Sequence, residues 1–163
     1  AAALVAFRAG CSRERIAEGL RSFRAIPHRV EPVREVNGVL WINDSKSTNI
    51  TSTEVAVAAL DRSFVLLLGG RHKGEPYTRL AERLQERCRA VVAYGEASPL
   101  IVKDLSARLK VVPAATFADV LTAARQLARP GDAVLLSPAC SSYDMFRNYE
   151  ERGDRFRAAV EAL

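Results

Sequence analysis

Short apolar runs alternate with longer amphipathic segments along most of the chain. The clearest runs are Phe64–Leu68, Ala90–Tyr94 and Ala133–Leu136. Runs this short, bounded by Gly or by turn residues, are typical of strands that are buried on both faces. Strands that alternate with helices predict a mostly parallel sheet with helices on both faces. The pattern therefore predicts an α/β fold.

A hairpin precedes the parallel strands. The segments Val30–Val36 and Val39–Asn43 are both extended in pattern, and Asn37-Gly38 lies between them. Asn-Gly is a strong signal for a two-residue turn between antiparallel strands. We therefore expect an antiparallel hairpin at the N-terminal edge of the sheet.

The amphipathic segments between the strands predict the helices. Thr51 and Glu54 have the spacing of a capping box, Thr116 suits an N-cap, and Ser142 is the expected start of the last helix. A short strand is expected at Val111-Val112. The expected helices cover residues 51–60, 77–88, 98–109, 116–128 and 142 onward.

The first residues have a different character. Ala1–Ala9 and Ser12–Phe23 predict two short helices. Pro27 disfavours helix in the residue before it, so Ile26–Arg29 is a candidate hinge. We therefore divide the chain into residues 1–25, the helical tail of a preceding domain, and residues 26–163. An internal start is expected because the chain begins with Ala1 and not with Met.

Composition narrows the class of protein. The chain has 163 residues, 48% of them hydrophobic, so it can bury a core. The net charge of +5 comes from scattered Arg and suits anionic ligands, but no basic stripe predicts nucleic-acid binding. No apolar run predicts a membrane span or a signal peptide. The three cysteines, Cys11, Cys88 and Cys140, are far apart, which predicts reduced thiols in the cytoplasm and no metal site.

Polar loops follow several of the strands, and ligands of open α/β sheets bind at the carboxyl ends of strands. The loop Asn43–Asn49 places Lys46 just before a helix N-terminus, which is favourable for binding an anion. The loops Gly69–Gly74 and Ser137–Asp144 add glycines, cations and small hydroxyls. Neither a P-loop nor a dinucleotide fingerprint occurs in the chain. Cys140 is expected to be a buried thiol and not a nucleophile.

In this order, these segments resemble the C-terminal domain of the Mur ligase family. The resemblance covers essentially the whole chain and implies a Rossmann-like fold. The matching residues are Pro27-His28-Arg29, Trp41–Asn49, Leu66–Gly70 with Lys73, and Leu135–Ser142 followed by Phe146, Asn148, Glu150, Arg152, Gly153 and Phe156.

The resemblance also implies roles for single residues. Arg29 and Asp44 are similar to residues that hold the adenosine of ATP, and Lys46 and His28 to the catalytic pair that faces its phosphates. The remaining matches concern D-glutamate. They are Thr48 and Lys73 for one carboxylate, and Ser142 with the backbone of Tyr149 for the other.

The reaction implied by the resemblance is formation of an amide bond. ATP phosphorylates the carboxylate of UDP-N-acetylmuramoyl-L-alanine, and the amine of D-glutamate then attacks the acyl phosphate. In the family, the P-loop, the magnesium ligands and the uridine nucleotide site lie in preceding domains. Residues 26–163 would then be the D-glutamate-binding domain, and residues 1–25 the tail of the central ATP-binding domain. We expect a monomer, inactive by itself, that works with those domains, ATP and Mg²⁺.

Two alternatives remain at this point. The same loops would serve a stand-alone module that binds a nucleotide or another anion without catalysis. A related ligase that adds another amino acid is the second alternative. The segment Asp44–Asn49 favours D-glutamate, because relatives that add diaminopimelate or lysine carry a different, Arg-containing signature there.

Overall fold

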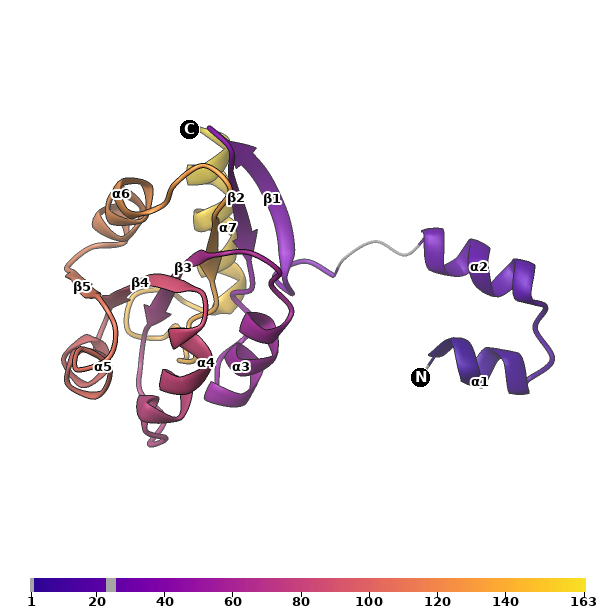
Figure 1. Cartoon of the computed structure of the whole chain (residues 1–163), viewed down its shortest axis with the longest axis horizontal. Helices are drawn as coiled ribbons and strands as arrows, with labels where there is room; N and C mark the ends of the chain where they lie inside the picture. Colours follow the sequence, from indigo (N-terminus) through magenta and orange to yellow (C-terminus); the bar gives the residue numbers. More distant parts are fainter. Residues whose placement is uncertain (1, 23–25) are drawn as a thin grey trace.

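A computed structural model describes residues 2–22 and 26–163, and it has an α/β body and a separate pair of helices (Figure 1). In these residues, six strands form one sheet in the order β1-β2-β6-β3-β4-β5. β1 pairs antiparallel with β2, and the other neighbours pair in parallel. The strands are β1 (Glu31–Val36), β2 (Val39–Asn43), β3 (Phe64–Gly69), β4 (Cys88–Tyr94), β5 (Val111–Ala114) and β6 (Ala133–Leu136).

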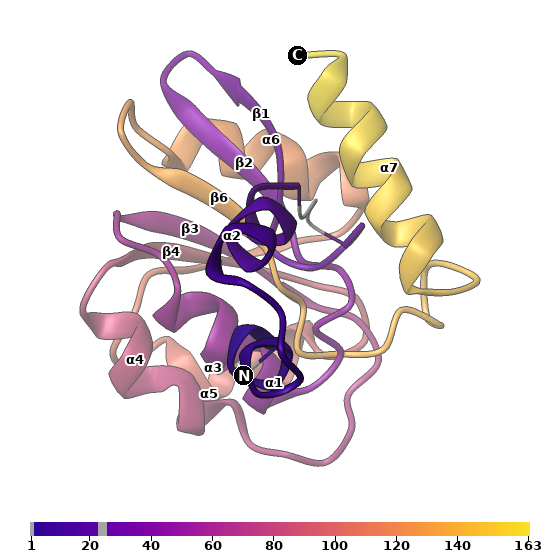
Figure 2. The same ribbon diagram turned by 90° about the vertical axis from the view of Figure 1, so that its right-hand side faces the viewer.

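The helices cover both faces of the sheet, as the sequence predicted (Figure 2). The chain moves outward from β2 through β3 and β4 to β5, and then returns to place β6 between β2 and β3. Right-handed crossovers place the connecting helices of the outward path on one face and the helix of the return path on the other. The helices of the outward path are α3 (Ile50–Ala58), η1 (Tyr77–Leu80) with α4 (Ala81–Gln85), and α5 (Ser98–Leu105). The helix of the return path is α6 (Phe117–Leu127), and α7 (Tyr149–Glu161), which follows the last strand, packs on the same face as α6.

Alternating residues of the central strands build two cores. Leu66 and Leu68 of β3 pack with α3, α4 and α5, whereas Val65 and Leu67 pack with α6 and α7. All four side chains are 0% exposed. Every side chain of a strand that is buried on both faces points into a core, which explains the unbroken apolar sequence of β3.

Several predicted helix boundaries are wrong. α3 begins at Ile50 and is capped by Asn49, whose side chain accepts a hydrogen bond from the amide of Ser52, so the Thr51–Glu54 capping box does not form. The segment 77–88 forms only η1 and α4, and Cys88 already belongs to β4. α5 ends at Leu105 and not at residue 109. The Thr116 cap is confirmed, with a capping box to Asp119.

The last helix begins seven residues later than expected, at Tyr149 and not at Ser142. The Ser142 carbonyl accepts hydrogen bonds from the amides of Met145 and Phe146 in a turn. Phe146 is buried and packs edge-on against Phe117, with ring centroids 5.0 Å apart. Asn148, not Ser142, caps α7 by accepting from the amide of Glu151.

The first helices are α1 (Ala2–Arg8) and α2 (Arg13–Ser22). They contact each other, bury no residue, and stand apart from the α/β body in Figure 1. Ala1 and residues 23–25, which include the predicted end of the second helix, lie outside the described residues. Within the described part of the chain, no helix is long and apolar enough to span a bilayer.

Gly69, at the end of β3, offers a test of this packing. It has a φ of +150°, and a Cβ there would meet the backbone of Tyr94, whose carbonyl carbon would lie only 2.8 Å away. We expect Gly69→Ala to lower the free energy of unfolding by about 3 kcal/mol, measured by urea denaturation. Gly131 also has positive φ but open space around it. Its replacement by Ala should cost only about 1 kcal/mol, and equal losses would contradict this explanation.

Candidate active site

The loops that follow β2, β3 and β6 meet at one edge of the sheet. Their strands are neighbours, and Asn43, at the end of β2, is level with Leu136 of β6. Backbone hydrogen bonds join the loops, from the amide of Ala139 to the Ser47 carbonyl (3.0 Å) and from the amide of Arg71 to the Ser141 carbonyl (2.9 Å). The three polar segments selected from the sequence therefore form one surface.

Asp44 is held at the junction of these loops. Its carboxylate accepts a hydrogen bond from the hydroxyl of Ser137 (2.7 Å) and another from the amide of Val30 (3.1 Å). Burial raises the pKa of Asp44 above its usual range, while the donors Ser47, Ser137 and Val30 and the charge of Arg29 oppose this shift. Asp44 thus joins the backbone just before β1 to the loop after β6.

A pocket of about 610 Å³ opens beside Asp44 and above the N-terminus of α3. The free N–H groups and the positive dipole end of a helix favour an anion at this position. Val55, 65% exposed, adds an apolar wall. The residues that line the pocket are Arg29, Val30, Asp44, Lys46, Ser47, Asn49, Thr51, Ser52, Val55, Ala56 and Glu75. The pocket thus combines an apolar wall with a cationic and amide-rich floor.

Lys73 and Thr48 lie together on the same surface. The ammonium of Lys73 donates to the hydroxyl of Thr48 at 3.4 Å, although 25 residues separate them in the sequence. Both side chains are accessible. A hydroxyl and an ammonium this close can bind a carboxylate together.

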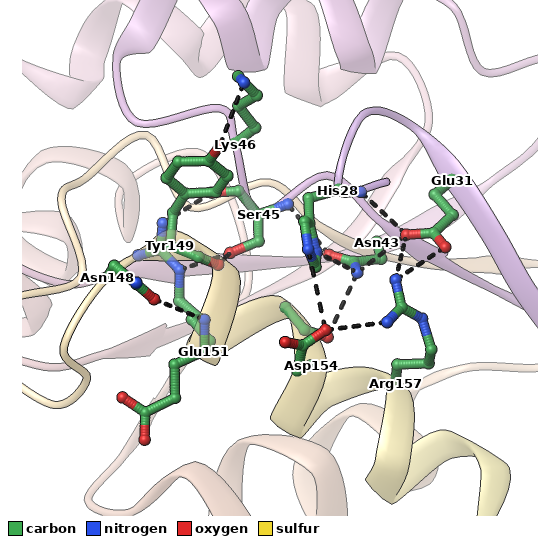
Figure 3. Close-up of polar contacts among 12 residues, drawn as sticks. His28, Glu31, Asn43, Ser45, Lys46, Asn148, Tyr149, Glu151, Asp154 and Arg157 are labelled. Carbon is green, nitrogen blue, oxygen red and sulfur yellow. Dashed lines mark hydrogen bonds and ion pairs between the residues drawn. The ribbon is translucent and has the colours of Figure 1, made fainter. Parts of the chain in front are cut away.

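Tyr149 connects the site with the first turn of α7. Its hydroxyl accepts a hydrogen bond from the ammonium of Lys46 (3.1 Å), which also lies 5.1 Å from the centre of the ring (Figure 3). Its backbone carbonyl accepts a hydrogen bond from the hydroxyl of Ser45 (2.8 Å). Ser142, the other residue predicted to contact the same carboxylate, is buried in the loop after β6. Lys46 and Tyr149 therefore belong to the same rim.

The ring of His28 packs edge-on against the ring of Tyr149, with ring centroids 6.0 Å apart. Its ring is buried beside Gly153 of α7, makes a 3.0 Å hydrogen bond with Asn43, and is not part of the pocket lining. Glu31 accepts hydrogen bonds from the His28 amide and from Arg157 (Figure 3). The backbone of His28 still reaches the site, because its carbonyl accepts from the amide of Lys46.

Cys140 lies beneath the loop after β6, fully buried. Its sulfur is 2.8 Å from the hydroxyl of Tyr77, which in turn is 3.2 Å from a ring nitrogen of His72. Burial is the main cause that raises the pKa of the Cys140 thiol to about 11. A thiol with so little thiolate is a poor nucleophile, which supports its assignment as a structural residue.

Two polar residues in this region received no role from the sequence alone. Asn43 is fully buried, and its side chain contacts His28, Glu31, the Gly153 carbonyl and the Ser45 amide. Ser47 is buried and lines the pocket. A polar residue at the end of an otherwise apolar strand is the signal that could have singled out Asn43. No comparable signal marks Ser47.

The residues that the structure describes contain no group of three His, Cys, Asp or Glu side chains placed to hold a metal ion. The acidic residues nearest the pocket are Asp44, which is committed to two hydrogen bonds, and Glu75. These residues do not form a magnesium site by themselves.

Residues 28–140 match the family model described as "Mur ligase, glutamate ligase domain". The chain belongs to the Mur ligase family. A curated relative from Salinibacter ruber, "UDP-N-acetylmuramoylalanine--D-glutamate ligase", is 48% identical over 91% of this chain and 32% of its own length. A relative of the same name from Myxococcus xanthus is 41% identical over 100% of this chain and 36% of its own length. The chain therefore spans about a third of the length of these Mur ligases.

Solved structures show the same fold at low sequence identity. FolC from E. coli, in complex with ADP, has a TM-score of 0.64 at 17% identity and covers 98% of this chain and 37% of its own. A MurF ligase from Thermotoga maritima, also in complex with ADP, has a TM-score of 0.57 at 19% identity, with coverage of 98% and 36%. At these identities the likeness establishes the Mur ligase fold alone.

The burial of Cys140 predicts selective alkylation. At pH 8, a thiol with a pKa of about 11 is thiolate in roughly one molecule in a thousand, so iodoacetamide should spare Cys140. Exposed Cys11 should react first, as measured by mass spectrometry of the peptides. The control is the chain in denaturant, where all three cysteines should react at similar rates. Rapid modification of Cys140 in the folded chain would contradict its assignment as a structural residue.

The environment of Asp44 predicts a second measurable effect. Ser137→Ala removes a donor that favours the charged carboxylate, so the pKa of Asp44 should rise further, measured by NMR titration of its carboxyl carbon. Because the folded pKa is raised, the stabilising contribution of Asp44 is full below its unfolded pKa and disappears as pH rises through the folded value. Thr122→Ala on α6 is the control. A lower pKa in Ser137→Ala would contradict the role of the hydroxyl.

Proposed function

We propose that this chain supplies part of the active site of an ATP-dependent ligase that adds D-glutamate to UDP-N-acetylmuramoyl-L-alanine during synthesis of the peptidoglycan precursor. The relatives that carry this activity in their names support the proposal. The observation that carries it is the convergence of Lys46, Lys73 and the N-terminus of α3 on one rim. That rim is suited to a reaction whose participants are all anionic.

The pocket beside α3 is the proposed nucleotide site. Arg29 and Asp44 would hold the adenosine, with Asp44 accepting a hydrogen bond from the ribose and Val55 supplying apolar surface. Lys46 would face the phosphates together with the free amides of α3. The ADP complexes of structural neighbours support a nucleotide at this fold. His28, with its ring against α7, would act by holding Lys46 through the backbone.

D-glutamate would bind across the loops after β2, β3 and β6. Thr48 and Lys73 would take one carboxylate, and the Ser142 hydroxyl with the backbone of Tyr149 would take the other. Burial of Ser142 in the loop and exposure of Lys73 suit a ligand that lies along the rim. Two separated carboxylate sites would select a dicarboxylic amino acid.

The chemistry requires positioning and charge neutralisation. The γ-phosphoryl group of ATP transfers to the carboxylate of UDP-N-acetylmuramoyl-L-alanine, which gives an acyl phosphate and ADP. The amine of D-glutamate attacks the acyl carbon, the C–O bond to phosphate breaks, and the amine loses a proton. Lys46 and Lys73 would stabilise the developing negative charge. No step is assigned to a metal ion, because the described residues do not form a metal site.

Residues 26–29 would act as the hinge on which this domain closes over its substrates, with Val30 directly after them. His28 and Val30 have φ values of +63° and +42°, and a β-branched residue is rarely found there. Hydrogen bonds to Glu31 and Asp44 hold these two backbone conformations. A segment held by a few polar contacts can change direction when those contacts change.

An NMR titration of this chain with D-glutamate tests the proposal. We expect chemical shift changes concentrated at Thr48, Lys73 and Ser142, because those residues would contact the carboxylates. Lys73→Ala should raise the dissociation constant about tenfold through loss of a charge-assisted hydrogen bond. Lys103→Ala, which removes a lysine of α5 away from the rim, should leave it unchanged. Shifts centred elsewhere, or equal effects of both variants, would refute the assignment.

A further inference from the structure

Arg152 of α7 is fully buried at the point where the loops of the candidate site meet. Its guanidinium donates to the Ser45 hydroxyl (2.9 Å) and to the Ser45 carbonyl (2.8 Å). It also donates through both terminal nitrogens to the Cys140 carbonyl, at 3.2 Å each. One side chain thus binds the loop after β2 and the loop after β6 at the same time.

The loop after β3 also passes close to Arg152. A Cβ built at Gly70 would lie 3.3 Å from a terminal nitrogen of Arg152 and would collide with the Ser141 carbonyl. Gly70 has a φ of +130°, which disfavours any other residue. The absence of a side chain at Gly70 therefore allows the third loop to close over the guanidinium.

The partners of Arg152 make a purely stabilising role a poor explanation. Every acceptor that the described residues offer to it is a neutral hydroxyl or carbonyl. Taking a guanidinium out of water is costly, and neutral acceptors offset this cost only in part. An apolar side chain of similar volume could fill the same space. The benefit of Arg152 therefore lies in the geometry of what it holds.

Ser45 extends this arrangement to the start of α7. Its hydroxyl accepts from Arg152 and donates to the backbone carbonyl of Tyr149 (2.8 Å). Asp44 and Lys46, the proposed nucleotide contacts, are the immediate neighbours of Ser45 in the chain. Of the proposed D-glutamate contacts, Ser142 follows Cys140 by two residues in the loop after β6, and Tyr149 is the first residue of α7.

We propose that Arg152 is a positioning residue that holds the nucleotide half and the D-glutamate half of the site in a single arrangement, so that both halves form or are lost together. The proposal rests on the proposed function. The planar fork of arginine reaches acceptors on two loops in fixed directions, whereas the ammonium of lysine is a single point on a flexible stem. Charge alone would therefore not replace it.

The experiment compares Arg152→Lys and Ser45→Ala with the parent chain. Arg155→Lys is the matched control, because Arg155 is an exposed residue on the same helix. NMR gives the dissociation constants for D-glutamate and for ADP. It also gives the exchange rates of the Arg71 and Ala139 amides, whose hydrogen bonds join the loops. The exchange rate of the Leu66 amide in β3 reports on the core.

Arg152→Lys should weaken both ligands roughly tenfold and accelerate exchange at Arg71 and Ala139 by a similar factor, with Leu66 unchanged. Ser45→Ala should produce the same pattern at roughly threefold, because it removes one acceptor and one donor. Arg155→Lys should leave all of these quantities unchanged. If Arg152→Lys fails to fold, Ser45→Ala decides the question.

Three results would overturn the positioning role. They are unchanged loop exchange in both variants, an effect on one ligand only, and an equal acceleration at Leu66, which would indicate general destabilisation. If the parent chain binds neither D-glutamate nor ADP, the proposed function fails. The amide exchange rates would then still decide whether Arg152 holds the loops together.

Discussion

The site depends on the return of β6 to the space between β2 and β3. Each loop that follows one of these strands carries only part of the polar chemistry, and none of them could surround a ligand alone. Hydrogen bonds along β6 align Asn43 of β2 with Leu136 and thereby bring the carboxyl ends of three strands to one edge. The connecting helices must then occupy both faces, because right-handed crossovers change face when the chain reverses direction. The position of β6 between β2 and β3 therefore sets both the packing of the core and the position of the site.

Buried polar groups give this edge its rigidity. Asp44 accepts hydrogen bonds from the Val30 amide and from Ser137, and Arg152 donates to the loops after β2 and β6. Each group would be costly to bury without its partners, so the loops are stable in the arrangement that satisfies both. Above them, the ammonium of Lys46 contacts the Tyr149 hydroxyl and that of Lys73 contacts the Thr48 hydroxyl, and both lysines are accessible at the rim. Buried, hydrogen-bonded groups below and accessible cations above are the arrangement expected for a preorganised site.

The helices α1 and α2 and the α/β body differ in how they are stabilised. The body has two cores, whereas the helical pair buries no residue and exposes Leu4, Val5, Phe7 and Leu20. Polar contacts of His28, Glu31 and Asn43 with α7 hold the segment that leads into β1. The direction in which the chain enters the body is thus set by side chains of α7, the same helix that carries Arg152 and Tyr149.

The sequence by itself determined the elements whose signals are local. The apolar strands, the Asn37-Gly38 turn and the Thr116 cap were all predictable, because burial on two faces, a primed turn and a capping hydroxyl each act within a few residues. The matching motifs also identified the polar loops. Only the tertiary structure decided that His28 faces α7, that Asn49 and not Thr51 caps α3, and that Phe146 delays the last helix until Tyr149. Those outcomes depend on packing between residues far apart in the chain, and no local pattern records which distant partner a side chain will meet.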